Sequence, residues 1–286
     1  MSFISVFDVL GPNMIGPSSS HTAGACSIGL MARRMLGGPV SQVQFTLYGS
    51  FSKTYKGHGT DRALLGGIMG FSTDDPRIPE AYALAEARGL RWRFVINDTE
   101  TEVHPNTVDI DAVGKNGTHL TIRGESLGGG KIRIVRIDGI EVDFTGEYDT
   151  LIVVHKDQVG MVAYITSCLS ESRINIAFMK LFREAKGDRA YSIIEFDGYL
   201  PEAVQGKILE KEHIEHVMLI QTESHGNGDE DRPIGDQGDP HAVGQEECCT
   251  DGDRCADSQE DRCTDRREDW HTSGHVDRRT GVQEEG

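Results

Sequence analysis

The C-terminal part of this 286-residue chain limits what can fold. Residues 222–286 contain no Leu, Phe or Tyr, and they carry 19 Asp and Glu residues against 7 Arg and no Lys. Such a segment cannot bury enough apolar surface to offset the loss of chain entropy, so we expect it to be disordered. Its composition also suggests a shifted reading frame or an unusual extension. Folded domains are therefore expected within residues 1–221.

The tail accounts for −12 of the formal net charge of −17, so the rest of the chain is only mildly acidic. A nucleic-acid-binding surface would need a basic patch, which the sequence lacks. No apolar run approaches the ~20 residues of a membrane span. The N-terminus lacks the basic-then-apolar pattern of a signal peptide. We expect a cytoplasmic protein that binds neither nucleic acid nor membrane.

One unusual motif precedes the first predicted helix, which covers residues 23–36. It reads Gly-Pro-Ser-Ser-Ser-His-Thr-Ala-Gly over residues 16–24. Capping a helix needs one Ser or Thr, whereas this motif supplies Ser18, Ser19, Ser20, His21 and Thr22. A helix N-terminus has free N–H donors and partial positive charge, so these hydroxyls predict a site for a carboxylate or phosphate.

A second motif, Lys-Gly-His-Gly-Thr-Asp at residues 56–61, repeats this design. It follows a predicted strand at 43–48 and precedes a predicted helix at 62–69, capped by Thr60 or Asp61. Glycines on both sides of His58, at positions 57 and 59, let a ligand approach closely. Imidazole is the side chain best suited to accept a proton near neutral pH. Two helix N-termini, each with a His, could therefore converge on one anionic ligand.

Other candidates carry less information. His104 precedes Pro105, which favours an extended and so directed residue, but a single His in a turn is weak evidence. The glycines at 128–130 could contact a ligand or only join two strands. Cys26 and Cys168 lie in apolar helical patterns and are expected to be small core residues. The tail cysteines have no familiar metal-site spacing.

The pattern of elements predicts an α+β fold with two domains. In residues 1–146, helices at 23–36, 62–69 and 80–88 accompany strands at 43–48, 91–96, 108–110, 119–123, 131–137 and 140–144, with an Asn-Gly hairpin turn at 116–117. Residues 148–221 show strands at 151–154, 175–182, 190–196 and 217–220 and helices at 160–172 and 202–210. The order βαββαβ is the ferredoxin-like plan.

Together, the motifs at 16–22 and 56–61 and the βαββαβ unit resemble the beta subunit of iron–sulfur-dependent L-serine dehydratases (L-serine ammonia-lyases), from Met1 to about Gln221. The βαββαβ unit is similar to an ACT domain, a module that pairs with another copy and often binds amino acids. The resemblance implies Asp157, Gly160 and Asn175 as ligand-facing or turn residues of that module.

The resemblance implies conversion of L-serine to pyruvate and ammonia. It implies His58 as the base and His21 as a second catalytic residue. The residues implied to hold the substrate are Ser18, Ser19, Ser20, Thr22, Gly59, Thr60, Asp61 and His104. In this family a [4Fe-4S] cluster with one open iron binds the substrate as a Lewis acid. Cluster ligation takes several cysteine thiolates, so we expect an alpha subunit to supply the ligands and this chain to supply none.

The expected partners are thus the alpha subunit, L-serine and a second copy of the chain through the ACT-like unit. One alternative is a non-catalytic regulatory subunit that senses an amino acid. It rests on a resemblance of the first domain to the anion-binding regulatory domain of some phosphoglycerate dehydrogenases. A plain assembly scaffold would leave the hydroxyl-rich motif without a purpose. The sequence separates neither serine from threonine as substrate nor one stoichiometry from another.

Overall fold

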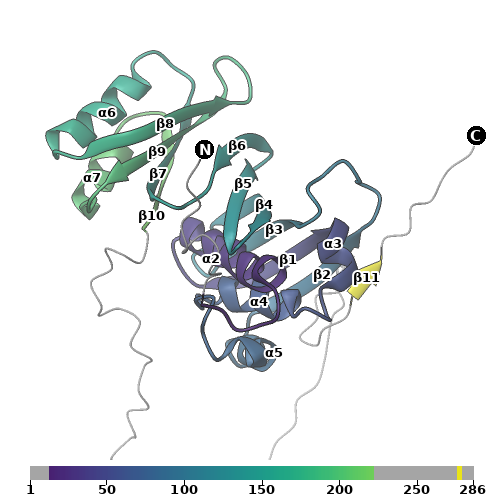
Figure 1. Ribbon diagram of the computed structural model, residues 1–286. Coiled ribbons are helices and arrows are strands. Elements are labelled where there is room, and N and C mark those ends of the chain that lie inside the picture. The colour runs from purple at the N-terminus through teal and green to yellow at the C-terminus, as the bar shows by residue number, and fades with distance from the viewer. Residues whose placement is uncertain (1–12, 222–275, 279–286) are drawn as a thin grey trace, which may run out of the picture. The chain divides into compact units, whose positions relative to one another are not determined.

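A computed structural model describes residues 13–221 and the short segment 276–278. Residues 13–221 belong to one compact unit with two β-sheets. The larger sheet has the strand order β11-β2-β1-β3-β4-β5-β6, and the smaller one has the order β10-β7-β9-β8. The predicted α+β class is confirmed. Figure 1 shows the helices of the first part of the chain lying along the larger sheet.

The larger sheet is mixed, because β1 runs parallel to β2 and antiparallel to β3. Its strands are β1 (Val40–Tyr48), β2 (Arg91–Asn97), β3 (Thr107–Gly114), β4 (His119–Gly128), β5 (Lys131–Ile137) and β6 (Ile140–Phe144). Apolar and polar residues alternate along β1, β3 and β6, as expected for strands with one buried face. All the strands predicted here are confirmed, and most are longer than predicted.

Two helices cover the buried face of this sheet. They are α2 (Ala25–Leu36) and α4 (Thr60–Ile68). They cross closely because glycines lie at the crossing: a Cβ at Gly67 would be 2.1 Å from the carbonyl oxygen of Cys26, and one at Gly29 would be 2.7 Å from that of Leu64. The helix α5 (Ala81–Ala87) follows the 3₁₀ turn Ile78–Glu80. The opposite face of the sheet carries polar residues.

The smaller sheet has the predicted order βαββαβ. In chain order, the strands of this sheet and the two helices between them are β7 (Asp149–Lys156), α6 (Met161–Glu171), β8 (Asn175–Arg183), β9 (Arg189–Asp197), α7 (Glu202–Leu209) and β10 (Ile214–Ile220). Leu151, Val153 and Ile194 pack in a cluster with residues of α6 and α7. The alternate residues Ile152 and Val154 belong instead to the core of the larger sheet. Both faces of the central strands β7 and β9 are therefore buried.

The structure differs from the sequence prediction in two helical segments. The helix predicted at 23–36 is preceded by a π-helical turn, η1 (Ser19–Gly24), so helical structure begins at the hydroxyl motif itself. A short helix, α3 (Gly49–Thr54), follows β1 where only a loop was expected. Its residues include no apolar repeat long enough to reveal a helix from the pattern alone. Both segments lie in the candidate site described below.

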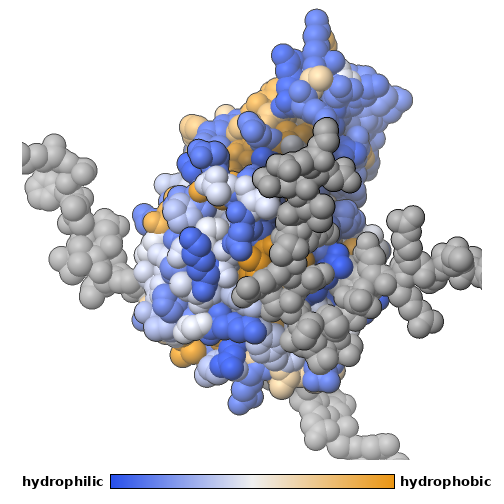
Figure 2. Space-filling view, turned by 90° about the vertical axis from the view of Figure 1, so that its right-hand side faces the viewer, coloured by the Kyte–Doolittle hydropathy of each residue, from blue (hydrophilic) through white to orange (hydrophobic). Residues whose placement is uncertain are grey.

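Cys26 and Cys168 are buried and free, which confirms them as core residues. Residues 276–278 form β11, paired parallel with β2. The rest of the tail predicted to be disordered, including its cysteines, lies outside the described residues. Within the part of the chain that the structure describes, no helix is long and apolar enough to cross a membrane. Figure 2 shows one face of the molecule, which is mainly hydrophilic with apolar residues gathered in a few places.

Candidate active site

The candidate site lies at one edge of the larger sheet, where several strands begin or end. Because β1 and β2 are parallel, Tyr48 and Asn97 lie side by side at their C-terminal ends. The antiparallel strands β3 and β4 bring Thr107 and Glu125 to the same edge. The loops that leave these strands therefore meet, although they are up to 80 residues apart in sequence. Both His-containing motifs adjoin this edge.

The π-helical turn η1 places the Ser-Ser-Ser-His motif against β4. Ser18 caps the turn, because its Oγ accepts the backbone N–H of His21 at 3.1 Å. Ser126 on β4 donates its hydroxyl to the carbonyl of Ser20 at 2.9 Å. Gly129 donates its backbone N–H to Oγ of Ser19 at 3.3 Å. The hydrogen bonds from Ser126 and Gly129 fix the motif at the sheet edge. A π-helical turn is often found at functional sites.

Both ring nitrogens of His21 have a hydroxyl neighbour. Nδ1 lies 3.3 Å from Oγ of Ser18, and Nε2 lies 2.9 Å from Oγ of Ser50. The ring also packs edge-on against Phe51, with ring centroids 5.4 Å apart. Burial lowers the pKa of His21, and the nearby charge of His58 lowers it further. His21 is thus held as a neutral, oriented imidazole.

His58 lies next to His21, with ring centroids 4.8 Å apart and ring planes at 88°. Its carbonyl accepts the hydroxyl of Thr22 at 3.1 Å, which ties the second motif to the first. Among the described residues, Nδ1 of His58 is buried and has no hydrogen-bond partner. A buried polar atom without a partner costs free energy. Of the two imidazoles, His58 is therefore the one with a nitrogen free for a ligand.

Helix α4 begins at Thr60, two residues after His58, and Thr60 adds a second unpaired group. The N-cap of the helix is Gly59 with φ of +70°, so the predicted caps Thr60 and Asp61 were wrong. Glycine adopts this left-handed conformation without strain. Thr60 is completely buried, and its Oγ1 has no partner among the described residues.

The hydrogen bonds of Asp61 and His104 go to residues other than His21 and His58. The carboxylate of Asp61 accepts the hydroxyl of Tyr82 at 2.7 Å and the N–H of Arg62 at 2.8 Å, so it joins α4 to α5. His104 accepts the N–H of Asn106 at Nδ1, within the loop before β3. That loop contacts the site through Pro105, whose carbonyl accepts the N–H of Ser50 at 2.6 Å. Substrate contacts from Asp61 and His104 remain predictions.

Ser50 and Ser126 are site residues that the sequence reasoning missed, whereas Gly129 belongs to the glycine run at 128–130 that was considered as a possible ligand contact. Ser50 follows the strand predicted at 43–48, and in the structure it is the second residue of α3 and contacts His21. A polar residue just beyond the end of a buried strand is a signal that could have indicated it. Ser126 belongs to a strand that was predicted to end at residue 123, and it faces η1 because β4 continues to Gly128.

The predicted ligand residues of the smaller sheet do not meet within one chain. Asp157 follows β7, and its carboxylate accepts N–H groups of Arg183 and Gly187 at 2.9 and 3.1 Å. Gly160 begins α6 with φ of +92°. Asn175 pairs with Asp197, at the opposite end of the strands. A ligand that touches both Asp157 and Asn175 would thus need two copies of the chain, and this ligand assignment remains a prediction.

The comparisons with known proteins cover the part of the chain that contains this site. A family model described as "Serine dehydratase beta chain" matches residues 5–90, which include both His motifs. The L-serine dehydratase beta chain of Peptoniphilus asaccharolyticus is 42% identical over 221 residues, which are 77% of this chain and 100% of that relative. This chain belongs to the L-serine dehydratase beta chain family.

Two further relatives are informative. The probable L-serine dehydratase beta chain of Bacillus subtilis is 40% identical over 220 residues, which are 77% of this chain and 99% of that relative. The D-3-phosphoglycerate dehydrogenase of Bacillus subtilis is 26% identical over 202 residues, which are 68% of this chain but 37% of that enzyme. The first domain's resemblance to part of some phosphoglycerate dehydrogenases therefore has support in sequence.

Proposed function

We propose that this chain is the beta subunit of an L-serine ammonia-lyase and that it shares an active site with an alpha subunit. The observation that carries the proposal is the His21–His58 pair. One imidazole is held by two hydroxyls, while the other keeps a buried nitrogen without a partner, next to a turn rich in serine hydroxyls. A base beside an anion-binding turn is the arrangement needed to remove a proton next to a carboxylate.

In this proposal Ser18, Ser19, Ser20 and Thr22 hold the carboxylate and ammonium of L-serine. The free hydroxyl of Thr60 and the N-terminus of α4 at Gly59 add further polar contacts. His21 stays neutral because burial lowers its pKa. Two charged imidazoles 4.8 Å apart would repel each other, so a neutral His21 lets His58 accept a proton.

The reaction would proceed by elimination. His58 takes the α-proton, and the β-hydroxyl leaves as water, which together convert L-serine to 2-aminoacrylate. This enamine tautomerises to the imine of pyruvate, and one water then hydrolyses the imine to pyruvate and ammonia. The overall change is L-serine to pyruvate plus ammonia, with the water released being balanced by the water consumed. A positioned base typically accounts for ~10²–10⁴-fold in rate.

The described residues of this chain do not fit an iron–sulfur cluster. Ligation of an iron–sulfur cluster uses cysteine thiolates, but burial raises the pKa of the Cys26 thiol to about 12. Its Sγ also lies 3.4 Å from the carbonyl of Phe71. Among residues 13–221, no three His, Cys, Asp or Glu side chains are grouped so that they could hold a metal ion. We therefore place the proposed [4Fe-4S] cluster on the alpha subunit.

We also propose that the smaller sheet is an ACT domain and that two copies associate through it. Its outer strand β8 is an edge strand, and it exposes 50% of Phe178 and 45% of Leu181. Exposed apolar residues on a free sheet edge favour pairing with another strand. This pairing would bring Asp157 of one copy nearer to Asn175 of the other, as the predicted ligand site requires.

A second candidate is a regulatory subunit that senses an amino acid without catalysis. The match to D-3-phosphoglycerate dehydrogenase favours it. That enzyme is similar to this chain over 202 residues, but it is named as a dehydrogenase and not as a dehydratase. In that case the serine-rich turn would bind an effector. The two functions differ in what happens to turnover when His58 is replaced.

The deciding experiment is anaerobic pyruvate formation from L-serine, with iron and sulfide, for this chain alone and mixed with a candidate alpha chain. We expect activity only in the mixture. Activity of this chain alone would overturn the assignment of the cluster to the alpha subunit. In the active mixture, loss of turnover in His58→Ala with substrate binding retained would support catalysis, whereas loss of cooperativity alone would support regulation.

A further inference from the structure

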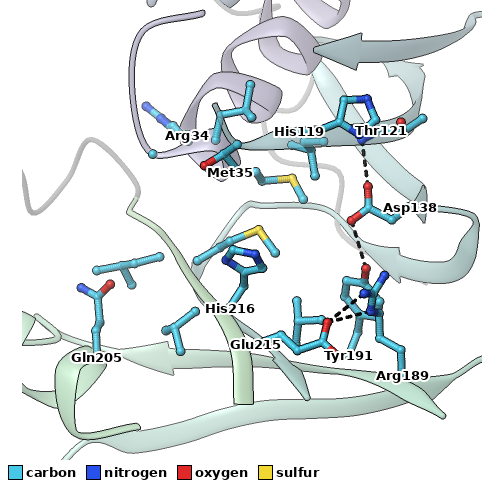
Figure 3. A pocket seen from close by; sticks show the side chains of 18 of the residues that line it. Arg34, Met35, His119, Thr121, Asp138, Arg189, Tyr191, Gln205, Glu215 and His216 are labelled. Atoms are coloured by element: carbon cyan, nitrogen blue, oxygen red, sulfur yellow. Dashed lines mark hydrogen bonds and ion pairs between the residues drawn. The ribbon is translucent and has the colours of Figure 1, made fainter. Parts of the chain in front are cut away.

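A cavity of about 740 Å³ lies at the far end of α2 from the candidate active site. Small-molecule sites in proteins typically have volumes of roughly 300–1,000 Å³ and are often found where two layers of structure meet. One wall is formed by residues 34–37 of α2 and its C-cap, the start of β4 and the turn between β5 and β6. The other is formed mainly by residues of β9 and β10, with single residues of β7 and α7. Figure 3 shows side chains of both walls pointing into the space between them.

The cavity presents charges of both signs. Arg189 and Glu215 form an ion pair with 2.9 Å between Nη2 and Oε2, and both side chains are nearly half exposed. Asp138 accepts the N–H of Thr121 at 2.9 Å and the hydroxyl of Tyr191 at 3.1 Å. Arg34 also lines the cavity, so its two cations and two anions balance, which disfavours a multiply charged anion such as a phosphate. The balanced charges suit a zwitterionic ligand.

The remaining lining of the cavity is mixed. Polar side chains, such as those of His119, Gln205 and His216, lie beside an apolar part that includes Met35, Leu36, Leu120, Val154 and Met218. Of these apolar residues, the first four are almost fully buried and belong to the shared hydrophobic core, so they cannot move away without exposing that core. An apolar side chain of moderate size could be buried against them.

We propose that this cavity binds a free α-amino acid with an apolar side chain. The exposed Arg189–Glu215 pair is the element that recognises it, with Arg189 facing the carboxylate and Glu215 facing the ammonium. An exposed ion pair contributes little stability by itself, so its groups can turn to a ligand at small cost. The helix α2, of 12 residues, spans about 18 Å, so the cavity is separate from the His21–His58 site.

Isothermal titration of the full chain with L-leucine tests the proposal. The comparison compounds are 4-methylpentanoate, which lacks the ammonium, and 3-methylbutylamine, which lacks the carboxylate. We expect L-leucine to bind and each comparison compound to bind at least tenfold more weakly. No heat of binding from L-leucine, or equal binding of the three compounds, would overturn the proposal.

Variants locate the binding. Arg189→Gln and Glu215→Gln should each weaken L-leucine binding at least tenfold, while circular dichroism shows that both variants remain folded. The controls are Asp157→Asn, in the predicted ligand residues of the smaller sheet, and Ser18→Ala, in the serine-rich turn. Both should bind L-leucine as the unaltered chain does. Binding lost in a control but kept in Arg189→Gln would place the ligand elsewhere and refute the assignment. No turnover is measured, so the result does not depend on the proposed function.

Discussion

The hydroxyl of Ser50 lies 2.9 Å from Nε2 of His21, although the two residues are 29 positions apart. Ser50 is itself fixed, because its N–H donates to the carbonyl of Pro105 at 2.6 Å. Three segments therefore hold the imidazole of His21: the π-helical turn η1, the start of helix α3 and the loop before β3. This arrangement leaves His58, and not His21, with an unpaired nitrogen.

Replacing Ser50 by Ala should lower kcat about tenfold and leave the KM for L-serine nearly unchanged. The variant removes the group that orients His21 but no proposed substrate contact. Ser41→Ala is the matched control, because Ser41 donates its hydroxyl to the carbonyl of Val113 at the start of β1, the opposite end of the strand that leads into α3. Steady-state kinetics of the alpha–beta mixture checks this. Equal effects of both variants would show that Ser50 has no special role.

Replacing His58 by Gln should lower kcat by ~10²–10⁴-fold, since a general base contributes about that much. The fold should be retained, because the His58 side chain is only partly buried and Nδ1 makes no hydrogen bond in the described structure. Pyruvate formation and thermal unfolding are the measurements. The control His119→Gln alters an exposed residue bonded to Asp111 and should keep full activity. Retained turnover in His58→Gln would favour the regulatory function.

The lowered pKa of His21 predicts that acid destabilises the fold. Below its ordinary pKa of 6.5, His21 of the unfolded chain binds a proton that the folded chain resists. The unfolded state then holds more protons, so the free energy of unfolding falls as the pH drops through this range. Urea unfolding at pH 7.5 and 5.5 should show a smaller decrease for His21→Gln than for the unaltered chain. An identical decrease would mean that His21 contributes nothing to this pH dependence.

Replacing Gly67 by Ala should destabilise the protein by about 1–3 kcal/mol, as is typical when a packed interface is overfilled. The new Cβ would lie 2.1 Å from the carbonyl oxygen of Cys26, and a backbone atom cannot move aside as a side chain can. Gly206→Ala is the control, because Gly206 is also helical but has no atom within 4 Å of the added carbon. That control should be stabilised by roughly 0.5–1 kcal/mol. Urea unfolding measures both.

Much of the fold could be predicted because its signals are local. Strands such as β1 and β6 alternate between apolar and polar residues, and the order of elements after residue 148 gives βαββαβ directly. The helix α3 was missed because its six residues, Gly49–Thr54, include only Phe51 as a buried apolar residue. Phe51 packs on the core of the larger sheet, so tertiary contact and not local preference stabilises this helix.

The sequence by itself determined which chemical groups this protein carries: the hydroxyls of residues 18–22, the imidazoles of His21 and His58, and the glycines around them. Only the tertiary structure decided their relations, namely that Ser50 and Ser18 hold His21, that His58 keeps a free nitrogen and that Asp61 binds Tyr82. The reason is physical. A residue's type fixes what it can donate or accept, whereas its partners depend on strand pairing between segments far apart in the chain.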